Sequence, residues 1–345
     1  MRIWYNDEDI MNWRKRCGDA IIVPVNVGII GERYSNLKED QKIMIKEKNV
    51  KVYYIDEDIK GTCFLVQGEQ EAILFDPGMA YYGETVVQRV KEILGTQTLR
   101  AVFLTHSHYD HVAAVPYIRQ EWPEIKVYAA EYACHIFEKT KAQQMMFHMS
   151  KTAAEESHHE WKSDDYKGEL LYADKPLEDG DRIALGEFVV EVIETIGHTQ
   201  CSVSFLINDE VMISSETIGL EGDFEGGYVP AFLISYKKTE ESLRRTIEAN
   251  PKQLYMPHRG LVIPDERYWK YMEKGLAATK DEIIRILASY PTLEAQILEM
   301  EEVFWKKAAD GAWPREAFDM NAKAMLRTVA AEFPEELSKV KSLQK

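Results

Sequence analysis

Short apolar runs recur along the first three quarters of the chain, and each is followed by a polar or charged residue. The runs are rich in Val, Ile and Phe and end at Gly, Pro or polar residues, which is typical of strands in a largely buried sheet. They cover residues 72–75, 101–104, 188–197, 211–215 and 253–257. The pattern predicts five strands that deliver polar residues at their ends.

Helical periodicity appears first at residues 84–94 and then throughout the last part of the chain. The first helix has five apolar residues on one face and stops at Gly95; these are Val86, Val87, Val90, Ile93 and Leu94. Beyond Asp265, two or three helices are expected, with Pro291 and Pro314 placed where helices should begin. These terminal helices suit a cap over a site, a dimer surface or additional core equally well.

The two patterns divide the chain into three predicted regions. Residues 1–48 form an N-terminal extension packed on the core, with a strand-like run at 20–27 and a solvated helix at 38–48. Residues 49–264 form a strand-rich unit, and residues 265–345 form a helical C-terminal region. No internal repeat or low-complexity tract interrupts this order.

Composition and charge narrow the range of partners. The 345 residues are 45% hydrophobic, enough for a substantial core, and carry a formal net charge of −16. Such acidity disfavours nucleic acid, because proteins that bind it normally present a basic surface. The start of the chain does not resemble a signal peptide, no run of about 18 apolar residues occurs, and the four cysteines are scattered. We expect a cytoplasmic protein with a small-molecule substrate and neither nucleic acid nor membrane as partner.

The densest chemistry lies at residues 106–111, His-Ser-His-Tyr-Asp-His, directly after the run at 101–104. A lone His-X-His is usually an ordinary surface or core pair, but six residues of this composition favour metal binding. Imidazole and carboxylate together suit Zn²⁺, Fe or Mn²⁺, and the segment offers two groups of ligands. Further residues of ligand type follow other predicted strands, namely Asp76, His198, Glu216 and His258. A two-metal site is predicted.

In order and spacing these residues resemble the five motifs of the metallo-β-lactamase-fold hydrolase superfamily. The matching positions are Asp76, residues 105–111, Gly197-His198-Thr199, Glu216 and His258. The resemblance covers about residues 49–264, which would be the catalytic domain, and it identifies a superfamily rather than a substrate. It implies an α/β (α+β) fold, a four-layer αββα sandwich with the site at one edge between the two sheets.

The resemblance also assigns roles to the ligands. The first metal would be bound by His106, His108 and His198, and the second by Asp110, His111 and His258. Asp76 would be structural, forming hydrogen bonds to the loop that presents the ligands. Glu216 departs from the pattern, since most hydrolytic members have Asp as the carboxylate that bridges the metals. Being one methylene longer, Glu216 can bridge, bind one metal only, or turn away and leave the second site weak.

Two metals about 3.5–4 Å apart share a hydroxide and direct it at a carbonyl or a phosphorus, so hydrolysis is the expected reaction. Asp110 is the candidate catalytic residue that receives the proton, and zinc is the expected metal, with Fe or Mn as alternatives. The acidic charge and the ligand set favour a small ester, thioester or lactone as substrate. A small-molecule phosphodiesterase, a di-iron oxidoreductase and a non-catalytic ligand-binding module are the alternatives. His108 stands where such oxidoreductases have Glu.

Substrate contacts are expected from residues beside the motifs and from an insertion at 131–165. Tyr81, Tyr82 and Tyr109 are candidates to line the pocket or orient a carbonyl, and Arg259 is a candidate to bind an anion. The insertion is rich in methionine and aromatic residues, which suits either an adaptable apolar surface or an ordinary packed helix. A homodimer through the C-terminal helices is one reading of the terminal region.

Overall fold

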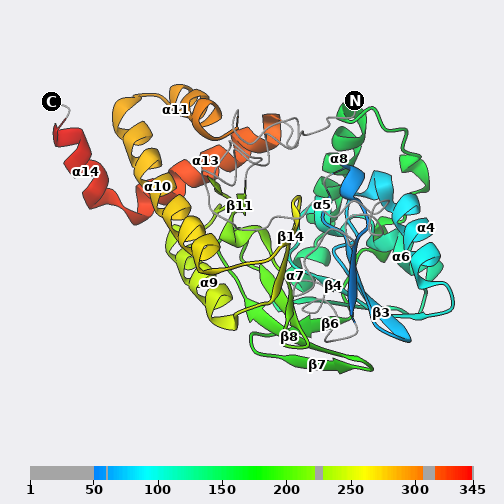
Figure 1. Ribbon diagram of the computed structural model, residues 1–345. Coiled ribbons are helices and arrows are strands. Elements are labelled where there is room, and N and C mark those ends of the chain that lie inside the picture. Colours follow the sequence, from blue (N-terminus) through cyan, green and yellow to red (C-terminus); the bar gives the residue numbers. More distant parts are fainter. Residues whose placement is uncertain (1–49, 60, 222–227, 306–314, 344–345) are drawn as a thin grey trace, which may run out of the picture.

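Two six-stranded β-sheets face each other in the computed structural model, and helices cover the outer face of each sheet (Figure 1). The structure describes residues 50–59, 61–221, 228–305 and 315–343. The predicted extension at 1–48 and Pro314 lie outside the described residues. The four layers agree with the predicted αββα sandwich.

The first sheet has the strand order β1-β2-β3-β4-β5-β6. Its strands are β1 (Lys51–Tyr54), β2 (Phe64–Gln67), β3 (Glu71–Phe75), β4 (Thr98–Leu104), β5 (Lys126–Ala130) and β6 (Lys175–Leu177). The first three strands pair antiparallel, and β3 to β6 pair parallel. Because β3 and β4 run parallel with Phe75 opposite Phe103, the residues that follow both strands meet at one edge of the sheet.

The second sheet has the order β14-β13-β10-β9-β8-β7. Its strands are β7 (Arg182–Leu185), β8 (Phe188–Glu194), β9 (Val203–Ile207), β10 (Val211–Ile213), β13 (Gln253–Met256) and β14 (Gly260–Val262). All pairs are antiparallel except β10 with β13, so the segments that follow these two strands also lie at one edge. A two-stranded ribbon, β11 (Leu220–Glu221) and β12 (Tyr228–Val229), follows β10 in sequence.

The helices form the two outer layers. On the side of the first sheet lie α4 (Gly83–Leu94), α5 (Tyr109–Val112), α6 (Val115–Glu121), α7 (Glu131–Phe137) and α8 (Thr140–Glu156). On the side of the second sheet lie α9 (Tyr236–Ala249), α10 (Glu266–Ser289), α11 (Leu293–Met300), α13 (Arg315–Glu332) and α14 (Pro334–Leu343). Short turns of other helix types are η1 (Glu57–Ile59), η2 (Ala80–Tyr82), η3 (Ser163–Asp165), η4 (Gly168–Leu170), η5 (Glu216–Ile218) and η6 (Glu301–Trp305).

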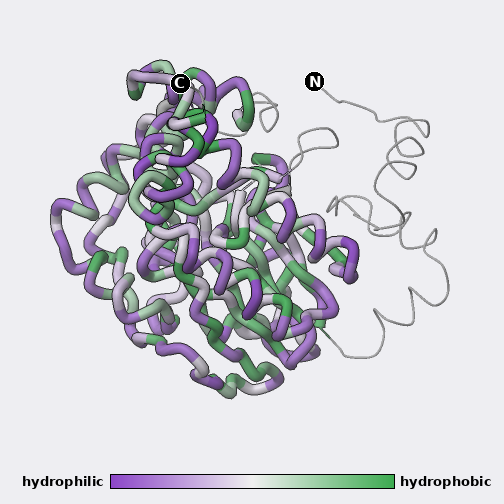
Figure 2. The backbone as a smooth tube through the Cα atoms, turned by 90° about the vertical axis from the view of Figure 1, so that its left-hand side faces the viewer, coloured by the Kyte–Doolittle hydropathy of each residue, from purple (hydrophilic) through white to green (hydrophobic). Residues whose placement is uncertain are grey.

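Two hydrophobic cores lie on the two faces of the second sheet. In β9, Phe205 and Ile207 belong to the core between the sheets, whereas Leu206 belongs to the core under α9 and α10. This alternation is the period of two that a strand requires. The apolar stripe of α13, from Phe318 to Val329, is buried in the second core, so the terminal helices pack on this sheet. Figure 2 shows hydrophobic segments gathered inside the molecule and hydrophilic ones mostly along its outside.

Several predicted boundaries are wrong by two or three residues. The strand expected to reach residue 197 ends at Glu194, and the one expected to reach 215 ends at Ile213. Just past these two strand ends, the hydroxyls of Thr195 and Ser215 bond to each other at 2.9 Å. The helix expected at Pro291 begins at Leu293, because the Thr292 side chain caps it by accepting from Ala295 N. Within the described ranges, no helix is both long and apolar enough to cross a membrane.

Candidate metal centre

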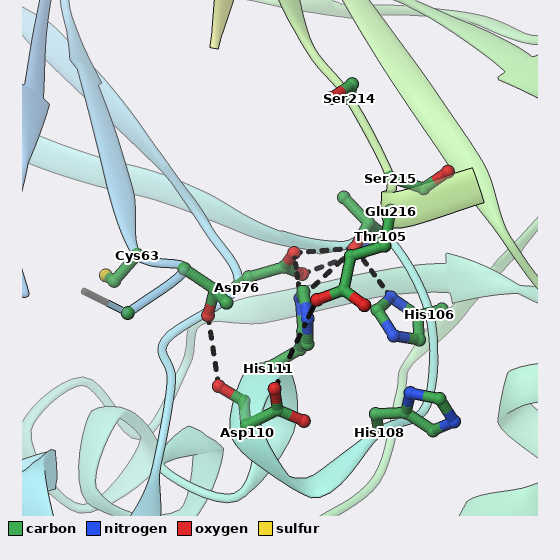
Figure 3. Close-up of polar contacts among 12 residues, drawn as sticks. Cys63, Asp76, Thr105, His106, His108, Asp110, His111, Ser214, Ser215 and Glu216 are labelled. Carbon is green, nitrogen blue, oxygen red and sulfur yellow. Dashed lines mark hydrogen bonds and ion pairs between the residues drawn. The ribbon is translucent and has the colours of Figure 1, made fainter. Parts of the chain in front are cut away.

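The seven predicted ligands converge at the edge where both sheets end. The described residues contain two groups that could hold a metal ion, one of His106, His108 and His198 and one of Asp110, His111, Glu216 and His258. Within each group the ligand atoms lie within 4.8 Å of one another. Figure 3 shows His106, which follows β4, and Asp110 and His111 of α5 around the carboxylate of Glu216, which follows β10. The structure thus brings the seven residues together as two neighbouring groups.

Three neutral imidazoles make up the first group. Burial lowers the pKa of His106 well below its ordinary value and that of His108 to about 4. Burial likewise lowers the pKa of His198, although Glu216 opposes the shift. Neutral rings keep a nitrogen lone pair, which a metal ion requires.

The hydrogen bonds of His198 fix which nitrogen carries that lone pair. Its Nδ1 lies 2.6 Å from the carbonyl oxygen of Ala231, which can only accept, so Nδ1 is the protonated nitrogen. The bare Nε2 then faces Nδ1 of His108 at 3.0 Å and Oε2 of Glu216 at 3.1 Å. A lone pair beside a carboxylate oxygen is repulsive unless a cation lies between them.

The second group contains two carboxylates and two histidines in close contact. Although burial opposes it, His111 and His258 lower the pKa of Asp110 to about 2. Burial also opposes a proton on His258, yet Glu216 and Asp110 raise its pKa to about 10. The carboxylates thus create a strongly negative pocket that favours positive charge.

Glu216 touches both groups. Its Oε1 lies 3.0 Å from Nε2 of His111 and 2.7 Å from Nε2 of His258, while its Oε2 faces His198. The residue opens η5, and the preceding Ser215 caps this turn by accepting from Thr217 N. The chain therefore places the longer carboxylate between the two groups, despite the extra methylene.

Asp76 holds the loop that carries the ligands, as its predicted structural role requires. It is buried and accepts hydrogen bonds from Thr105 N at 2.8 Å, Thr105 Oγ1 at 2.6 Å and His111 Nδ1 at 2.8 Å. The last bond leaves Nε2 of His111 to face Glu216. A carboxylate behind a metal-ligating histidine orients the ring and fixes its tautomer.

The donor set fits divalent transition metals. His106 offers the clearest sign, because its Nε2 is buried and has no hydrogen-bond partner in the described part of the chain. Its Nδ1 lies 3.1 Å from Thr105 Oγ1, which leaves Nε2 as the free ligand atom. Imidazole with carboxylate at two adjacent groups suits Zn²⁺, Fe or Mn²⁺, and an orphaned buried nitrogen is costly in the absence of a cation.

A residue that the sequence prediction missed supports the second group. Asp56 is 1% exposed and accepts from Thr62 N at 3.0 Å and Cys63 N at 2.8 Å. Burial raises the pKa of Asp56 to about 7 against these hydrogen bonds. The loop it holds contacts two ligands: Gly61 O accepts from His258 N at 2.8 Å, and Thr62 Oγ1 donates to Asp110 O at 3.0 Å. No strand was predicted near Asp56, so no pattern singled it out.

We expect Asp56→Ala to destabilise the protein and loosen the second ligand group. The change leaves two buried N–H groups without an acceptor, at a cost of about 1–3 kcal/mol each. Urea unfolding measures this loss, and elemental analysis measures metal retention. Glu84→Ala removes an exposed carboxylate of α4 and serves as control. Equal stability of the two variants would contradict the role of Asp56.

The candidate substrate residues have different surroundings. Tyr82 donates its hydroxyl to Asp58, with Arg89 beside the ring, and this contact accounts for Tyr82 without a substrate. Tyr81 is buried against the ring of His159 at 5.1 Å. Tyr109 and Arg259 are half-buried next to the ligands Asp110 and His258. Of the four candidates, these two directly neighbour a ligand candidate in the chain.

The Met-rich insertion forms α7, α8 and η3. Its helix α8 packs against η2 and α5, the helix that carries Asp110 and His111. Met146 is buried in the same core as Phe205 and Ile207, whereas Met145 is 59% exposed. The rings of Phe147, Trp161 and Tyr166 contact one another in tilted and edge-on arrangements, with centroids 5.5–5.7 Å apart. Helix α8 of the insertion thus lies next to the helix that carries Asp110 and His111.

Comparison with known proteins agrees with this geometry. The chain is 27% identical over 213 residues to a probable metallo-hydrolase, YqgX, of Bacillus subtilis, a match covering 59% of this chain and 84% of that protein. It is 23% identical over 199 residues to a hydroxyacylglutathione hydrolase of Prochlorococcus marinus, covering 56% of this chain and 63% of the relative. The structure resembles the metallo-beta-lactamase family protein TTHA1429 from Thermus thermophilus, with a TM-score of 0.55, 16% identity and coverage of 78% and 88% of the two chains.

The family assignment rests on a match that spans more than half of the chain. A sequence model of the metallo-beta-lactamase superfamily matches residues 57–258, a span that includes all seven candidate ligands together with Asp76. With two facing sheets, flanking helices and two ligand groups at the shared edge, this chain belongs to the metallo-beta-lactamase superfamily.

Proposed function

We propose that the protein is a dinuclear metal-dependent hydrolase of a small ester, thioester or lactone. The observation that carries the proposal is the position of Glu216, whose two carboxylate oxygens face histidines of both ligand groups. A carboxylate shared between the two ligand groups supports a two-metal site. The names of the relatives, a probable metallo-hydrolase and hydroxyacylglutathione hydrolases, support hydrolysis of an acyl bond.

The residues divide the work of such a reaction. When bound, two divalent cations supply Lewis acidity and lower the pKa of water toward neutrality. The first histidine group and the second group with its carboxylates would hold them, with zinc as the proposed metal. In this proposal Asp110, half-buried in the second group, accepts a proton and returns it to the leaving group. Tyr109 and Arg259 are the residues that we propose contact the substrate.

The net charge of the chain favours a small substrate over a nucleic acid. The net charge of −16 opposes binding of a nucleic acid polymer. The proposal therefore includes a small-molecule substrate and no nucleic acid partner. A cytoplasmic location and no membrane partner are further parts of the proposal, which the charge does not address. A homodimer through the C-terminal helices is the assembly to test alongside it.

We expect purified protein to carry metal and to hydrolyse one class of activated acyl substrate only while metal is bound. The test combines elemental analysis of protein purified without added metal with a panel of p-nitrophenyl esters, thioesters, lactones and a phosphodiester. Chelation should abolish the activity, and zinc should restore it. The double variant His106→Ala with His108→Ala is the matched control and should stay inactive after zinc is added.

Two results would contradict the proposal. One is full activity after complete chelation, which would exclude the metal-dependent reaction. The other is a metal content of zero after mild purification. Turnover of the phosphodiester alone would replace the acyl hydrolase with the phosphodiesterase alternative.

A further inference from the structure

The segment that supports His198 has no regular structure of its own. Residues 230–235 lie between β12 and α9 without forming a helix or strand. Within them, Ala231 O accepts from His198 Nδ1 at 2.6 Å. The carbonyl of Gly197, next to His198, accepts from Leu233 N at 3.0 Å and Ile234 N at 2.9 Å. The position of the His198 ring thus depends on what holds this segment.

The last turns of α13 hold it. Thr328 Oγ1 donates to Leu233 O at 3.0 Å, and Glu332 accepts from Ser235 Oγ at 2.6 Å and from Lys237 N at 3.0 Å. Ser235 in turn caps α9 by accepting from Lys238 N at 3.1 Å. The negative charge of Glu332 therefore lies at the N-terminus of α9, where the helix dipole favours it.

Helix α13 is itself firmly seated. Its apolar stripe is buried in the core that it shares with α9, α10 and the second sheet (Figure 1). Phe333 directly follows α13 and packs edge-on against Tyr236, with ring centroids 5.2 Å apart. Lys237 and Lys280 lie over the ring of Phe333. A well-packed helix can fix the position of a loop to which it forms hydrogen bonds.

We propose that Glu332, with Thr328, is a positioning residue for His198, so that the C-terminal helix α13 sets the geometry of the first ligand group. The path runs from Glu332 and Thr328 to the segment 231–235, and from Ala231 O to His198 Nδ1. Loss of either anchor lets the carbonyl of Ala231 move and frees the ring to turn. The inference rests on the metal-binding part of the proposed function, but the state of the His198 ring can be measured without metal.

A purely structural role makes a different prediction. If Glu332 only caps α9, its loss lowers the melting temperature and leaves the His198 ring unchanged. If Glu332 positions the ring, its loss also changes the exchange rate of the His198 Nδ1 proton and the zinc affinity of the first ligand group. Stability alone cannot distinguish these roles, so the readout must be at the histidine.

The experiment uses full-length protein with ¹⁵N-labelled histidine and three variants, Glu332→Ala, Glu332→Gln and Thr328→Val. Nuclear magnetic resonance of metal-free protein reports the His198 Nδ1 proton. A zinc titration with a competing chelator then gives the midpoint at His198 and, as internal reference, at His258. Glu336→Gln on α14, which removes the charge from an exposed contact with Lys280, is the matched control.

In Glu332→Ala we expect the Nδ1 proton of His198 to exchange with water faster. We also expect zinc to bind about tenfold more weakly at His198, which is the lower end of the loss seen when a residue that orients a metal ligand is removed. The midpoint at His258 should change less. Glu332→Gln retains acceptor oxygen and should recover part of the loss, while Thr328→Val should act like a milder Glu332→Ala. Glu336→Gln should match the parent protein.

An unchanged His198 proton and an equal midpoint in all three variants would overturn the inference, even with a lowered melting temperature. Should Glu332→Ala fail to fold, Thr328→Val provides the same comparison with nearly unchanged side-chain volume. Parent protein that binds no zinc would instead contradict the proposed function, whereas normal parent binding with insensitive variants contradicts only the role of α13.

Discussion

We expect Glu216→Gln to lose the metal ion of the second ligand group before that of the first. The substitution keeps the size of the side chain but removes the negative charge that faces histidines of both groups. The first group, His106, His108 and His198, remains a complete set of three ligands with an open fourth position. Elemental analysis should find about one ion per chain, and hydrolysis should slow by about 100-fold, the scale of losing one electrostatic contact to a transition state.

The shorter carboxylate is the matched control. Glu216→Asp retains the charge and restores the residue usual in the superfamily, at the cost of reach, so metal content should fall less and activity should be intermediate. The two variants measured together separate charge from geometry. Two ions and full activity in Glu216→Gln would show that Glu216 is a bystander to the metals.

We expect Asp76→Asn to weaken metal binding by His111 while leaving the histidine itself in place. The Asp76 carboxylate accepts from His111 Nδ1, from Thr105 Oγ1 and from Thr105 N. An amide cannot accept at both oxygen positions: turned one way it places an N–H against His111 Nδ1, and turned the other way against Thr105 N. The first orientation moves the imidazole proton to Nε2, the nitrogen that faces Glu216, and removes the ligand lone pair.

The expected effect of Asp76→Asn is a 10–100-fold loss of metal affinity at the second group, the usual scale for a residue that orients a ligand. Competition with a chelator measures the affinity, and ¹⁵N shifts of labelled His111 report the tautomer. Asp76→Ala is the harsher comparison, because it leaves three buried donors without an acceptor and should also lower the free energy of unfolding. Unchanged affinity together with an unchanged tautomer in Asp76→Asn would show that Asp76 does not act through His111.

The ligand positions were predictable because they follow buried strands. A strand buried on both faces leaves an apolar run in the sequence, and neighbouring strand ends meet at one edge of a sheet. This reasoning identified His198, Glu216 and His258 from the runs before them, and the structure brings them to the residues after β4. The exact strand ends were not predictable, since strand pairing depends on segments that are distant in the sequence.

The supports of the ligands left no sequence signal. Ala231 and Gly61 act through carbonyl oxygens, which every residue has. Tyr82 lies beside a motif and so resembled a pocket residue, but its hydroxyl partner, Asp58, is 24 residues earlier in the chain. Glu332 is a polar residue on an amphipathic helix, where exposure to solvent is the ordinary expectation. Pairings of this kind emerge only when distant segments are placed in space.

The ligands come from both sheets, and this links metal supply to the lifetime of the protein. Residues 106–111 follow a strand of the first sheet, whereas His198, Glu216 and His258 follow strands of the second. Residues that would hold one cation therefore come from both halves of the sandwich, and a bound cation would link the two. By mass action, free metal at 100 times its dissociation constant adds about 2.7 kcal/mol to the folded state. Protein made when metal is scarce would unfold more often and be degraded faster by proteases. Scarcity of metal would therefore lower the amount of the protein as well as its activity.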